Sequence, residues 1–507
     1  MTSLRYTEVM NASVPAGTED IPVLDYSLFR EELITMLGRE QFHCLNYFCH
    51  RIPEGLRFMC CIADDETGTI RILCHEKKDG GTSLRSLSDS CTAMHIFERE
   101  IHERYGLGFE GHPWLKPVRY PHDRADRRNV ISTYPFYEME SEVLHEVGVG
   151  PVHAGVIEPG HFRFICNGEK VLHLEIQLGY QHRGIERLFT EAGENGLRRS
   201  LLAESIAGDT ATGHGLAHAQ LSESLAGFIP PPSLEIERCI ALEMERIGIH
   251  IGDTAALCAD VAYQLGQVAC EALRTLIINT TQFWCGNRFG KGLIRPGGSD
   301  YPLTEKIADE ILRVLGEVER RYVNVTDCVY TLPSVLGRFE ETGTVSRQQA
   351  LSAGAVGMAA RSCGLVRDIR ASHPFQYYRQ MEIKPALQTK GDVMARGRLR
   401  VMEVRESAGI IRKLVEVWKN GEKNTGRPVY DLRFMPESLA VSVTEGWRGE
   451  ICHVALTDAD GRLVDYRIKD PSLHNWMALA LAVRNQEISD FPLCNKSFNL
   501  SYCGNDL

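Results

Sequence analysis

The sequence contains sixteen cysteines but no Cys-x-x-Cys pair, the spacing that commonly holds zinc or an iron–sulfur cluster. The cysteines are scattered from Cys44 to Cys503, so their spacing indicates no ligand set. We expect reduced, mostly buried thiols and no metal bound by this chain. His43-Cys44 and Cys49-His50 lie close together, and zinc is an alternative there, but their alternation with aromatic residues favours a half-buried strand.

Long apolar runs and an excess of positive charge are also missing. No stretch approaches the roughly 20 apolar residues that a membrane-spanning helix needs. The first twenty residues have no apolar core and include acidic side chains, so we expect no secretory signal. The net charge of -11 argues against nucleic acid as a partner, because backbone phosphates favour Lys and Arg. Any membrane contact is therefore expected to be made through partner proteins.

The length and the changes of pattern predict two domains. A chain of 507 residues exceeds what one hydrophobic core usually holds. Residues 20–121 have the pattern of a small mixed α/β domain, in which strands at 56–63 and 69–74 are joined by a turn. Residues 122–148 are polar and non-periodic, which is typical of a linker. Residues 149–507 then form the second domain.

The second domain is predicted to be mainly helical. Two short strand-like segments, GHFRFICN and EKVLHLEIQL, come first, and residues 233–283 then form a long amphipathic stretch. Residues 438–470 alternate again, with a hairpin signal at DADG. Further helices are expected at residues 303–322, 346–362 and 395–420. The predicted fold class is α+β: a small mixed α/β N-terminal domain, and a larger, mainly α-helical domain with small sheets at its edges.

The segment GLGFEG at 106–111 matches the GxGxxG fingerprint of dinucleotide sites. That fingerprint requires a strand before it and a helix after it. Here a predicted helix over 88–106, with Ser88 or Asp89 as its cap, precedes the glycines, and a proline-containing loop follows. We therefore expect no dinucleotide site in this segment.

Several motifs carry a family resemblance. The segment FEREIHERYGLGFEGHPWLKPVRYP resembles the C-type subunit of complex I, in which this domain serves docking. Seven later segments, in order, resemble the D-type subunit of complex I and the large subunit of energy-converting [NiFe] hydrogenases. They are GPVHAGVIEPGHFRF, LGYQHRGIERL, LEMERIGIH, NRFGKGLIRPGGS, RSCGLVRDIRASHPFQYY, GDVMARGRLRVMEVRES and EGWRGEICH. The fused order is similar to formate hydrogenlyase-type large subunits.

The resemblance also shows what this sequence has lost. Hydrogenases of this family hold a nickel–iron centre with four cysteines, two near each end of the large domain. The aligned positions here are Ala207 and Thr210 for the first pair and Ser501 and Gly504 for the second, with Cys503 one residue out of place. Alanine and glycine offer no ligand, and hydroxyls are poor substitutes for thiolate. We expect no nickel–iron centre in this chain.

The quinone-contacting positions of complex I are changed as well. In complex I a histidine of the entry loop and a tyrosine near a helix start contact the quinone. The resemblance aligns these two residues with Ile157 and Gly208 of this sequence, so quinone reduction at the usual place is not expected. The entry loop keeps its hydrogenase form, with Glu158 and His161. The histidine that follows the first cysteine pair is retained as His214.

These alignments give two groups of candidate site residues. The catalytic candidates are Glu158, His161 and Arg448, and the cavity left by the absent metal is expected to be lined by Glu158, Ala207, Thr210, Arg448, Ser501 and Cys503. The candidates for contact with a partner's cofactor are Arg183, Glu186 and His250. Structural roles are the alternative: a His182–Glu186 pair on one helix, ion pairs around Glu243, Glu245, Arg246 and His250, and a buried network of Arg361, Asp368 and Arg370.

The resemblance implies a subunit of a membrane-associated oxidoreductase complex of the formate hydrogenlyase or complex I kind, which couples electron transfer to ion translocation. The implied partners are an iron–sulfur small subunit, which carries the cluster, and antiporter-like membrane subunits. The implied location is the cytoplasmic side of the inner membrane. Two alternatives stay open: a genuine [NiFe] hydrogenase or NADH:quinone oxidoreductase large subunit, with the NAD and quinone binding of such complexes, and a catalytically inactive scaffold.

Overall fold

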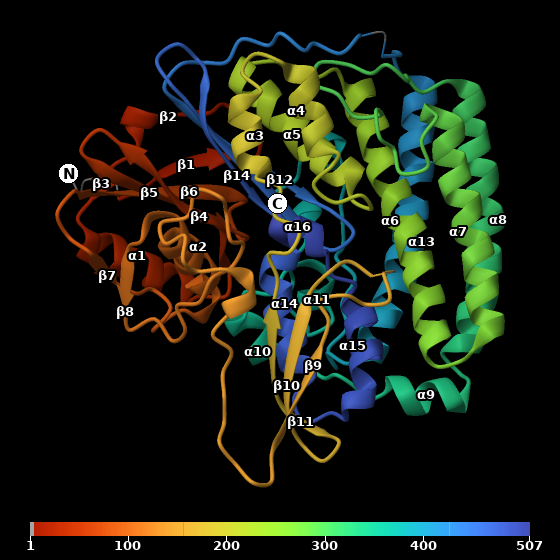
Figure 1. The fold of residues 1–507 in the computed structure, drawn as a ribbon. Helices are drawn as coiled ribbons and strands as arrows, with labels where there is room; N and C mark the ends of the chain where they lie inside the picture. The colour runs from red at the N-terminus through yellow and green to blue at the C-terminus, as the bar shows by residue number, and fades with distance from the viewer. Residues whose placement is uncertain (1–4, 156, 425) are drawn as a thin grey trace.

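The computed structural model describes residues 5–155, 157–424 and 426–507. Its N-terminal part, residues 5–121, has one main sheet of strand order β1-β6-β5-β4, with β3 parallel to β6. The helices α1 and α2 lie beside this sheet (Figure 1). The elements are β1 (Thr7–Met10), β2 (Ala16–Gly17), β3 (Val23–Leu24), α1 (Tyr26–Leu37), β4 (Phe42–Ile52), β5 (Gly55–Asp64), β6 (Thr69–Lys78), β7 (Ser83–Arg85), α2 (His95–Tyr105) and β8 (Gly108–Glu110).

The predicted hairpin is confirmed as β5 and β6, which pair antiparallel across the DDETG turn. The segment with His43 and Cys49 forms β4, as predicted, but its first eight residues are buried, because helices pack on one face and the C-terminal part covers the other. No group of three or more potential metal ligands occurs among the described residues. The paired His-Cys dipeptides are therefore explained as strand residues.

The start of α2 differs from the prediction. The helix begins at His95 rather than after Ser88 or Asp89, although it ends at Gly106 as expected, with φ of 71°. The cause is Glu98, whose buried carboxylate accepts hydrogen bonds from the Ser88 hydroxyl and from the backbone N–H of Leu87. These hydrogen bonds hold Leu87 and Ser88 beside the helix, so the residues before His95 do not extend it.

Long helices dominate the C-terminal part, residues 145–507, and α6, α7, α8 and α13 run side by side (Figure 1). The predicted stretch 233–283 is two antiparallel helices, because the chain turns at Ala262 with φ of 57°. The predicted helix 346–362 is likewise divided, at Gly354 with φ of 68°. The helices are α3 (Ile185–Glu191), α4 (Gly196–Ala203), α5 (Ala211–Ala226), α6 (Pro232–Asp260), α7 (Gln264–Cys285), α8 (Glu305–Val329), α9 (Pro333–Phe339), α10 (Arg347–Ser352), α11 (Gly357–Arg361), α12 (Ile369–Ser372), α13 (Val393–Asn420), α14 (Ser472–Ala482), α15 (Phe491–Phe498) and α16 (Tyr502–Asp506).

Two small sheets accompany these helices, so the predicted α+β class is confirmed. The first has the order β11-β10-β9 and contains the two predicted strand-like segments as β10 and β11. The second has the order β14-β13-β12-β2, and β13 and β14 form the hairpin predicted at DADG. The strands are β9 (His145–Val149), β10 (His161–Asn167), β11 (Lys170–Gln177), β12 (Ser438–Glu445), β13 (Glu450–Thr457) and β14 (Leu463–Lys469). Most of β9 falls in the range predicted as linker, and the domain boundaries stay a prediction.

The two parts share one hydrophobic core. Phe48 and Met59 of the N-terminal sheet belong to the same buried cluster as Ile240 and Met244 of α6. Hydrogen bonds cross the same boundary, since Lys469 Nζ donates to the backbone oxygen of Cys44. The N-terminal part is therefore packed directly against the C-terminal part.

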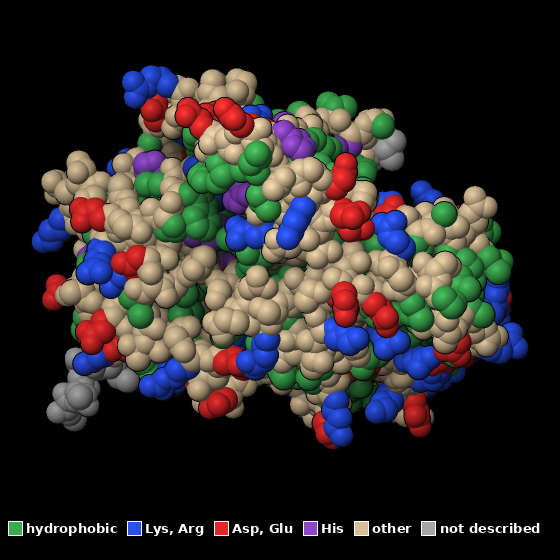
Figure 2. All heavy atoms as spheres, turned by 90° about the horizontal axis from the view of Figure 1, so that it is seen from below, with side chains coloured by type: hydrophobic (Ala, Val, Ile, Leu, Met, Phe, Trp, Pro, Cys, Tyr) green, Lys and Arg blue, Asp and Glu red, His purple; other side chains and the backbone are tan. Residues whose placement is uncertain are grey.

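The end of the molecule at β9–β11 is the face seen in Figure 2. Hydrophobic side chains and histidines gather on it between the N-terminal part and the long helices, and lysine, arginine and acidic side chains are interspersed over the rest. Among the described residues, no helix combines the length and the apolar character that crossing a membrane requires.

Candidate functional site

The segments that align with the nickel-binding motifs meet in space. The first segment leads into α5, and the second leads into α16 at the C-terminus. The guanidinium of Arg183 joins them, because its Nη2 lies 2.9 Å from the backbone oxygen of Ile206 and 3.0 Å from that of Cys503. The fold therefore retains the place where the two halves of such a centre would come together.

Arg448 lies at this meeting point and is almost completely buried. Its Nη1 and Nη2 lie 2.7 and 2.6 Å from the two carboxylate oxygens of Asp209, and Nη1 also lies 3.1 Å from Thr210 Oγ1. The guanidinium stacks on the ring of Trp447 and donates to the backbone oxygen of Asn499. Arg448 thus bridges the two segments and engages the hydroxyl at one aligned ligand position.

The other aligned positions are also poorly suited to metal binding. Ser501 Oγ accepts a hydrogen bond from the backbone N–H of Gly504 at 2.9 Å and so caps α16. A Cβ at Gly504 would lie 2.7 Å from Asp470 Oδ2, so a cysteine there would collide with this carboxylate. Ala207 is fully buried and has no ligand atom. These residues do not fit a four-thiolate nickel–iron centre.

Cys503 is the one thiol next to these positions. Its Sγ lies 3.5 Å from Ser501 Oγ. Burial, reinforced by the neighbouring Glu158 carboxylate, raises the pKa of the Cys503 thiol to about 12. The thiol is therefore protonated near neutral pH, whereas a metal ligand or nucleophile requires the thiolate.

A row of buried, hydrogen-bonded polar side chains begins at Asp470, beside Gly504. His214 Nε2 lies 3.0 Å from Asp470 Oδ2, and His214 Nδ1 lies 3.1 Å from His453 Nε2. The chain continues through Tyr466, whose hydroxyl lies 2.9 Å from His453 Nδ1 and 3.1 Å from His218 Nδ1. Burial lowers the pKa of His218 to about 3 and that of His453 well below its usual value. Neutral imidazoles can each donate and accept, so a continuous hydrogen-bonded chain forms.

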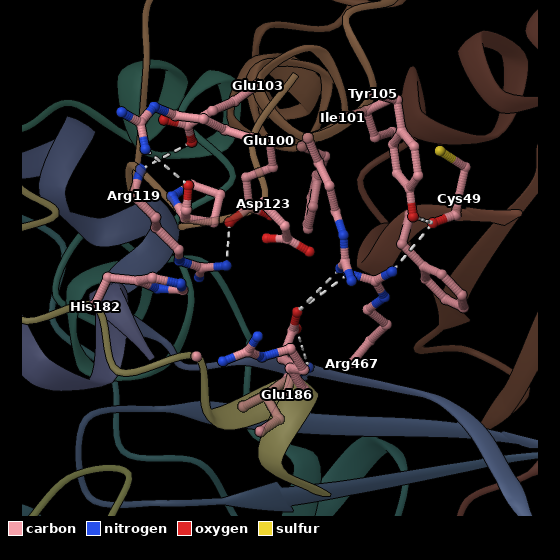
Figure 3. A pocket seen from close by; sticks show the side chains of 18 of the residues that line it. Cys49, Glu100, Ile101, Glu103, Tyr105, Arg119, Asp123, His182, Glu186 and Arg467 are labelled. Atoms are coloured by element: carbon pink, nitrogen blue, oxygen red, sulfur yellow. Dashed lines mark hydrogen bonds and ion pairs between the residues drawn. The ribbon is translucent and has the colours of Figure 1, made fainter. Parts of the chain in front are cut away.

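Arg183 also belongs to the walls of a cavity of about 380 Å³. Figure 3 shows this cavity from close by. It is lined by α2 and β4 of the N-terminal part, residues 119–124, residues 182–187 and the end of β14. Glu186 points into it and accepts from Arg467 Nη1 at 3.1 Å and from the backbone N–H of Ile468 at 3.0 Å. Burial alone would raise the pKa of Glu186, but Arg467, Arg119 and Arg104 lower it. The carboxylate is thus ionised.

Charged side chains dominate the walls of this cavity. Glu100 lies beside Arg119, and burial raises the pKa of Glu100 to about 7 despite that arginine. His182 lies before α3 begins, and its Nδ1 lies 2.7 Å from the backbone oxygen of Asp506. The alternative of a helical His182–Glu186 pair is therefore wrong. Arg183 and Glu186 are brought together at this cavity.

The structure does not bring His250 to the same cavity. His250 is fully buried in α6, and its Nε2 lies 2.7 Å from Glu403 Oε2 of α13. Glu403 also accepts from Arg361 Nη2 at 2.7 Å, and Arg370 pairs with Glu243. The predicted buried network of Arg361, Asp368 and Arg370 is confirmed, and it includes the ion pairs predicted for Glu243, Arg246 and His250. Glu245 instead accepts from the backbone N–H groups of Thr212 and Gly213.

The candidates of the entry loop are separated. Glu158 is half-buried and lies against Cys503, at the meeting point with Arg448. His161 begins β10, and its Nδ1 lies 3.1 Å from the backbone oxygen of Gly150. Asp209, Asp470 and His453 were not expected from the sequence. Asp209 could have been found, because it lies between the two aligned positions of the first motif, whereas the other two have no local signal.

Comparisons with known proteins place this arrangement in a family. A family model described as the 30 Kd subunit of respiratory-chain NADH dehydrogenase matches residues 38–129, and one described as its 49 Kd subunit matches residues 260–433. The carbon monoxide-induced hydrogenase of Rhodospirillum rubrum is 29% identical over 356 residues, which are 70% of this chain and 97% of that protein. The chain belongs to the family that unites the fused C/D-type subunits of complex I with the large subunits of hydrogenases.

Two further relatives match about four fifths of this chain. Formate hydrogenlyase subunit 5 of Escherichia coli K12 is 26% identical over 428 residues, 81% of this chain and 74% of that protein. The C/D-type subunit of the NADH-quinone oxidoreductase of Phocaeicola vulgatus is 24% identical over 441 residues, 80% of this chain and 83% of that protein. The family predicted from the sequence motifs is therefore confirmed. The chain is similar to both the hydrogenase and the quinone-reducing branch.

Proposed function

We propose that this chain is the large subunit of a membrane-associated, hydrogenase-related oxidoreductase complex, and that it works there without a nickel–iron centre of its own. The observation that carries the proposal is the Arg448–Asp209 pair. Nη1 of this guanidinium also donates to the hydroxyl of Thr210, so this aligned ligand position is engaged in a hydrogen bond instead of being free for a metal ion.

The cavity with Arg183 and Glu186 is the proposed contact with an iron–sulfur small subunit. Its walls contain several cations, including Arg104, Arg119 and Arg467, which favour an electron entering a nearby cluster. Antiporter-like membrane subunits complete the proposed complex, on the cytoplasmic side of the inner membrane. In this arrangement the complex couples electron transfer to ion translocation.

The residues of this chain would supply proton positions rather than a metal. An electron that arrives at the partner's cluster is best compensated by a proton nearby. The Asp470–His214–His453 chain can shift its protons by tautomer exchange, and Cys503 retains its own. In the proposed complex, a change in the charge of the partner's cluster therefore shifts protons along these side chains.

Metal analysis of the intact complex tests the proposal. The complex is purified through a tag on this chain, and nickel and iron are measured by mass spectrometry against the amount of the chain. We expect iron from the partner's cluster and nickel far below one atom per chain. Nickel at one atom per chain would establish a genuine [NiFe] hydrogenase and overturn the proposal.

A second measurement separates an active complex from a scaffold. The partner's cluster is reduced with dithionite, and its reoxidation by quinones, sulfur compounds or protons is followed by electron paramagnetic resonance. We expect one acceptor to reoxidise the cluster. No reoxidation by any of them would identify a catalytically inactive scaffold. Reduction of the cluster by NADH followed by its reoxidation by quinone would identify an NADH:quinone oxidoreductase.

A further inference from the structure

A second and larger cavity, of about 550 Å³, lies between the N-terminal part and the C-terminal part. It is lined by α2, the loop 113–118, Tyr134 and Tyr137, β11 and α14. This volume is in the range of small-molecule sites, about 300–1,000 Å³. The proposed function uses none of its walls.

The walls are mainly apolar and aromatic. Trp114 contributes a half-buried indole and Trp476 a small part of its buried one, and Leu115, Met477 and Ala480 add aliphatic surface. Such walls suit a flat apolar body, because aromatic rings stack favourably and exclude water. The cavity therefore has the composition of an organic ligand site rather than of a water-filled crevice.

Arg99 is the polar feature that specifies the ligand. It is only 8% exposed, and it donates through Nε to the backbone oxygen of Lys116 and through Nη2 to that of Pro117, each at 2.8 Å. No ion pair with a described carboxylate accompanies these bonds. The neighbouring acids on α2 are already used: Glu98 accepts from Leu87 and two serines, and Glu103 accepts from the backbone N–H groups of residues 118–120. A buried guanidinium without a counter-ion is costly, so this position favours an anion.

The other charges at the cavity do not supply that counter-ion. Glu175 is the carboxylate in the walls, and Lys116 Nζ pairs with it at 2.5 Å. The backbone N–H of Tyr137 also donates to Glu175, at 2.7 Å. The exposed Arg484 adds a further positive charge, so the cavity has a net positive charge.

We propose that this cavity binds a small organic anion with a flat apolar body. The body packs against Trp114 and the apolar walls around it, and the carboxylate, sulfonate or phosphate pairs with Arg99. The site is separate from the cavity at Arg183 and from the Arg448–Asp209 pair.

The test uses the purified complex and two fluorescent probes of similar size. The anion 8-anilinonaphthalene-1-sulfonate has the proposed chemistry, and neutral N-phenyl-1-naphthylamine lacks the charge. Affinities are measured by fluorescence titration for wild type, Arg99→Met, Trp476→Phe and Arg128→Met. Arg128 is the matched control, because it is an exposed linker arginine paired with Asp126.

We expect Arg99→Met to weaken binding of the anionic probe at least tenfold and to leave binding of the neutral probe within twofold. Trp476→Phe should weaken both probes alike and by less than about threefold, because it trims only a small part of the apolar wall, and Arg128→Met should change neither probe. Equal binding of the anion by wild type and Arg99→Met would overturn the proposal, as would an equal loss of both probes in Arg99→Met. If Arg99→Met does not fold, Arg99→Gln takes its place, with the same two overturning outcomes.

A displacement experiment identifies the source of the natural anion. Bound 8-anilinonaphthalene-1-sulfonate is titrated with 1-naphthoate and, separately, with a short-chain phosphatidic acid below its micelle concentration. Displacement by the naphthoate indicates a soluble aromatic acid, and displacement by the phosphatidic acid indicates a lipid. Displacement by neither compound would contradict the proposed site.

Discussion

The guanidinium of Arg448 forms a two-pronged ion pair with Asp209, with nitrogen–oxygen distances of 2.7 and 2.6 Å. The pair connects the segment before α5 with the loop after β12, and Arg448 also reaches the backbone oxygen of Asn499. Three distant stretches of chain thus converge on one cation. The ion pair thus connects the stretches that contain the aligned ligand positions.

Breaking this ion pair should destabilise the protein. Asp209→Asn leaves the buried Arg448 uncompensated, but the Asp209 side chain is 35% exposed, so water screens part of the loss. We expect a loss of about 1–2 kcal/mol in the free energy of unfolding, measured by urea denaturation. Arg462→Met, which breaks an exposed pair with Asp460, is the control and should change the value by less than about 0.5 kcal/mol. Equal effects of the two substitutions would contradict this role.

Cys503 should react slowly with alkylating agents. Its pKa of about 12 leaves little thiolate at pH 7.5, so we expect iodoacetamide to label Cys503 at least tenfold more slowly than the exposed Cys328. Peptide mass spectrometry over a time course measures both rates. Glu158→Gln removes a negative charge beside the thiol and should accelerate labelling of Cys503 while leaving Cys328 unchanged. Rapid labelling of Cys503 in the wild type would show that a thiolate is present.

Arg183 should hold the two motif segments together. Arg183→Met removes its hydrogen bonds to the backbone oxygens of Ser205, Ile206 and Cys503. We expect faster amide hydrogen exchange both before α5 and in α16, measured by mass spectrometry. Arg187→Met in the adjoining helix α3, which breaks only an exposed pair with Glu191, should leave both segments unchanged. Faster exchange in one segment alone would argue against a bridging role.

Glu237 should make stability depend on pH. Burial raises the pKa of its carboxyl to about 7, against hydrogen bonds that lower it, and Oε1 has no side-chain partner among the described residues. Because the folded state retains a proton that the unfolded state loses near pH 4.5, stability falls as pH rises from about 4.5 to about 7 and changes no further above that range.

Glu237→Gln should remove this part of the pH dependence. The neutral amide keeps the shape of the protonated acid, so the variant should gain about 2 kcal/mol relative to wild type between pH 4.5 and pH 7.5. Urea denaturation at both pH values measures the difference. Glu382→Gln is a control for the loss of a charge, since both Glu382 and its partner Lys384 are exposed. Parallel pH profiles of wild type and Glu237→Gln would refute the assignment.

Local patterns in the sequence predicted most helices and strands, but not their interruptions. The turn between α6 and α7 falls at Ala262 and Tyr263, and neither glycine nor proline marks it. The start of α2 depends on the burial of Glu98 against Ser86 and Ser88, which is a tertiary contact. In both cases packing outweighed the local preference of the chain.

Only those residues of the site that lie within sequence motifs could be predicted. Ala207, Thr210, Ser501 and Gly504 were found by alignment, and the structure shows what their neighbours do. The pairing of His250 with Glu403 joins residues 153 positions apart, so no spacing rule reveals it. The same holds for His214 and Asp470, 256 positions apart, and for the counter-ion missing at Arg99 among the described carboxylates.

The pairing of β2 with β12 affects how the protein is made. Ala16 leaves the ribosome more than four hundred residues before its partner Leu439. The N-terminal sheet can fold early, whereas β2 has to wait with an unpaired edge until β12 has been synthesised. A ribosome that stalls before β12 therefore leaves a product with an open, aggregation-prone edge.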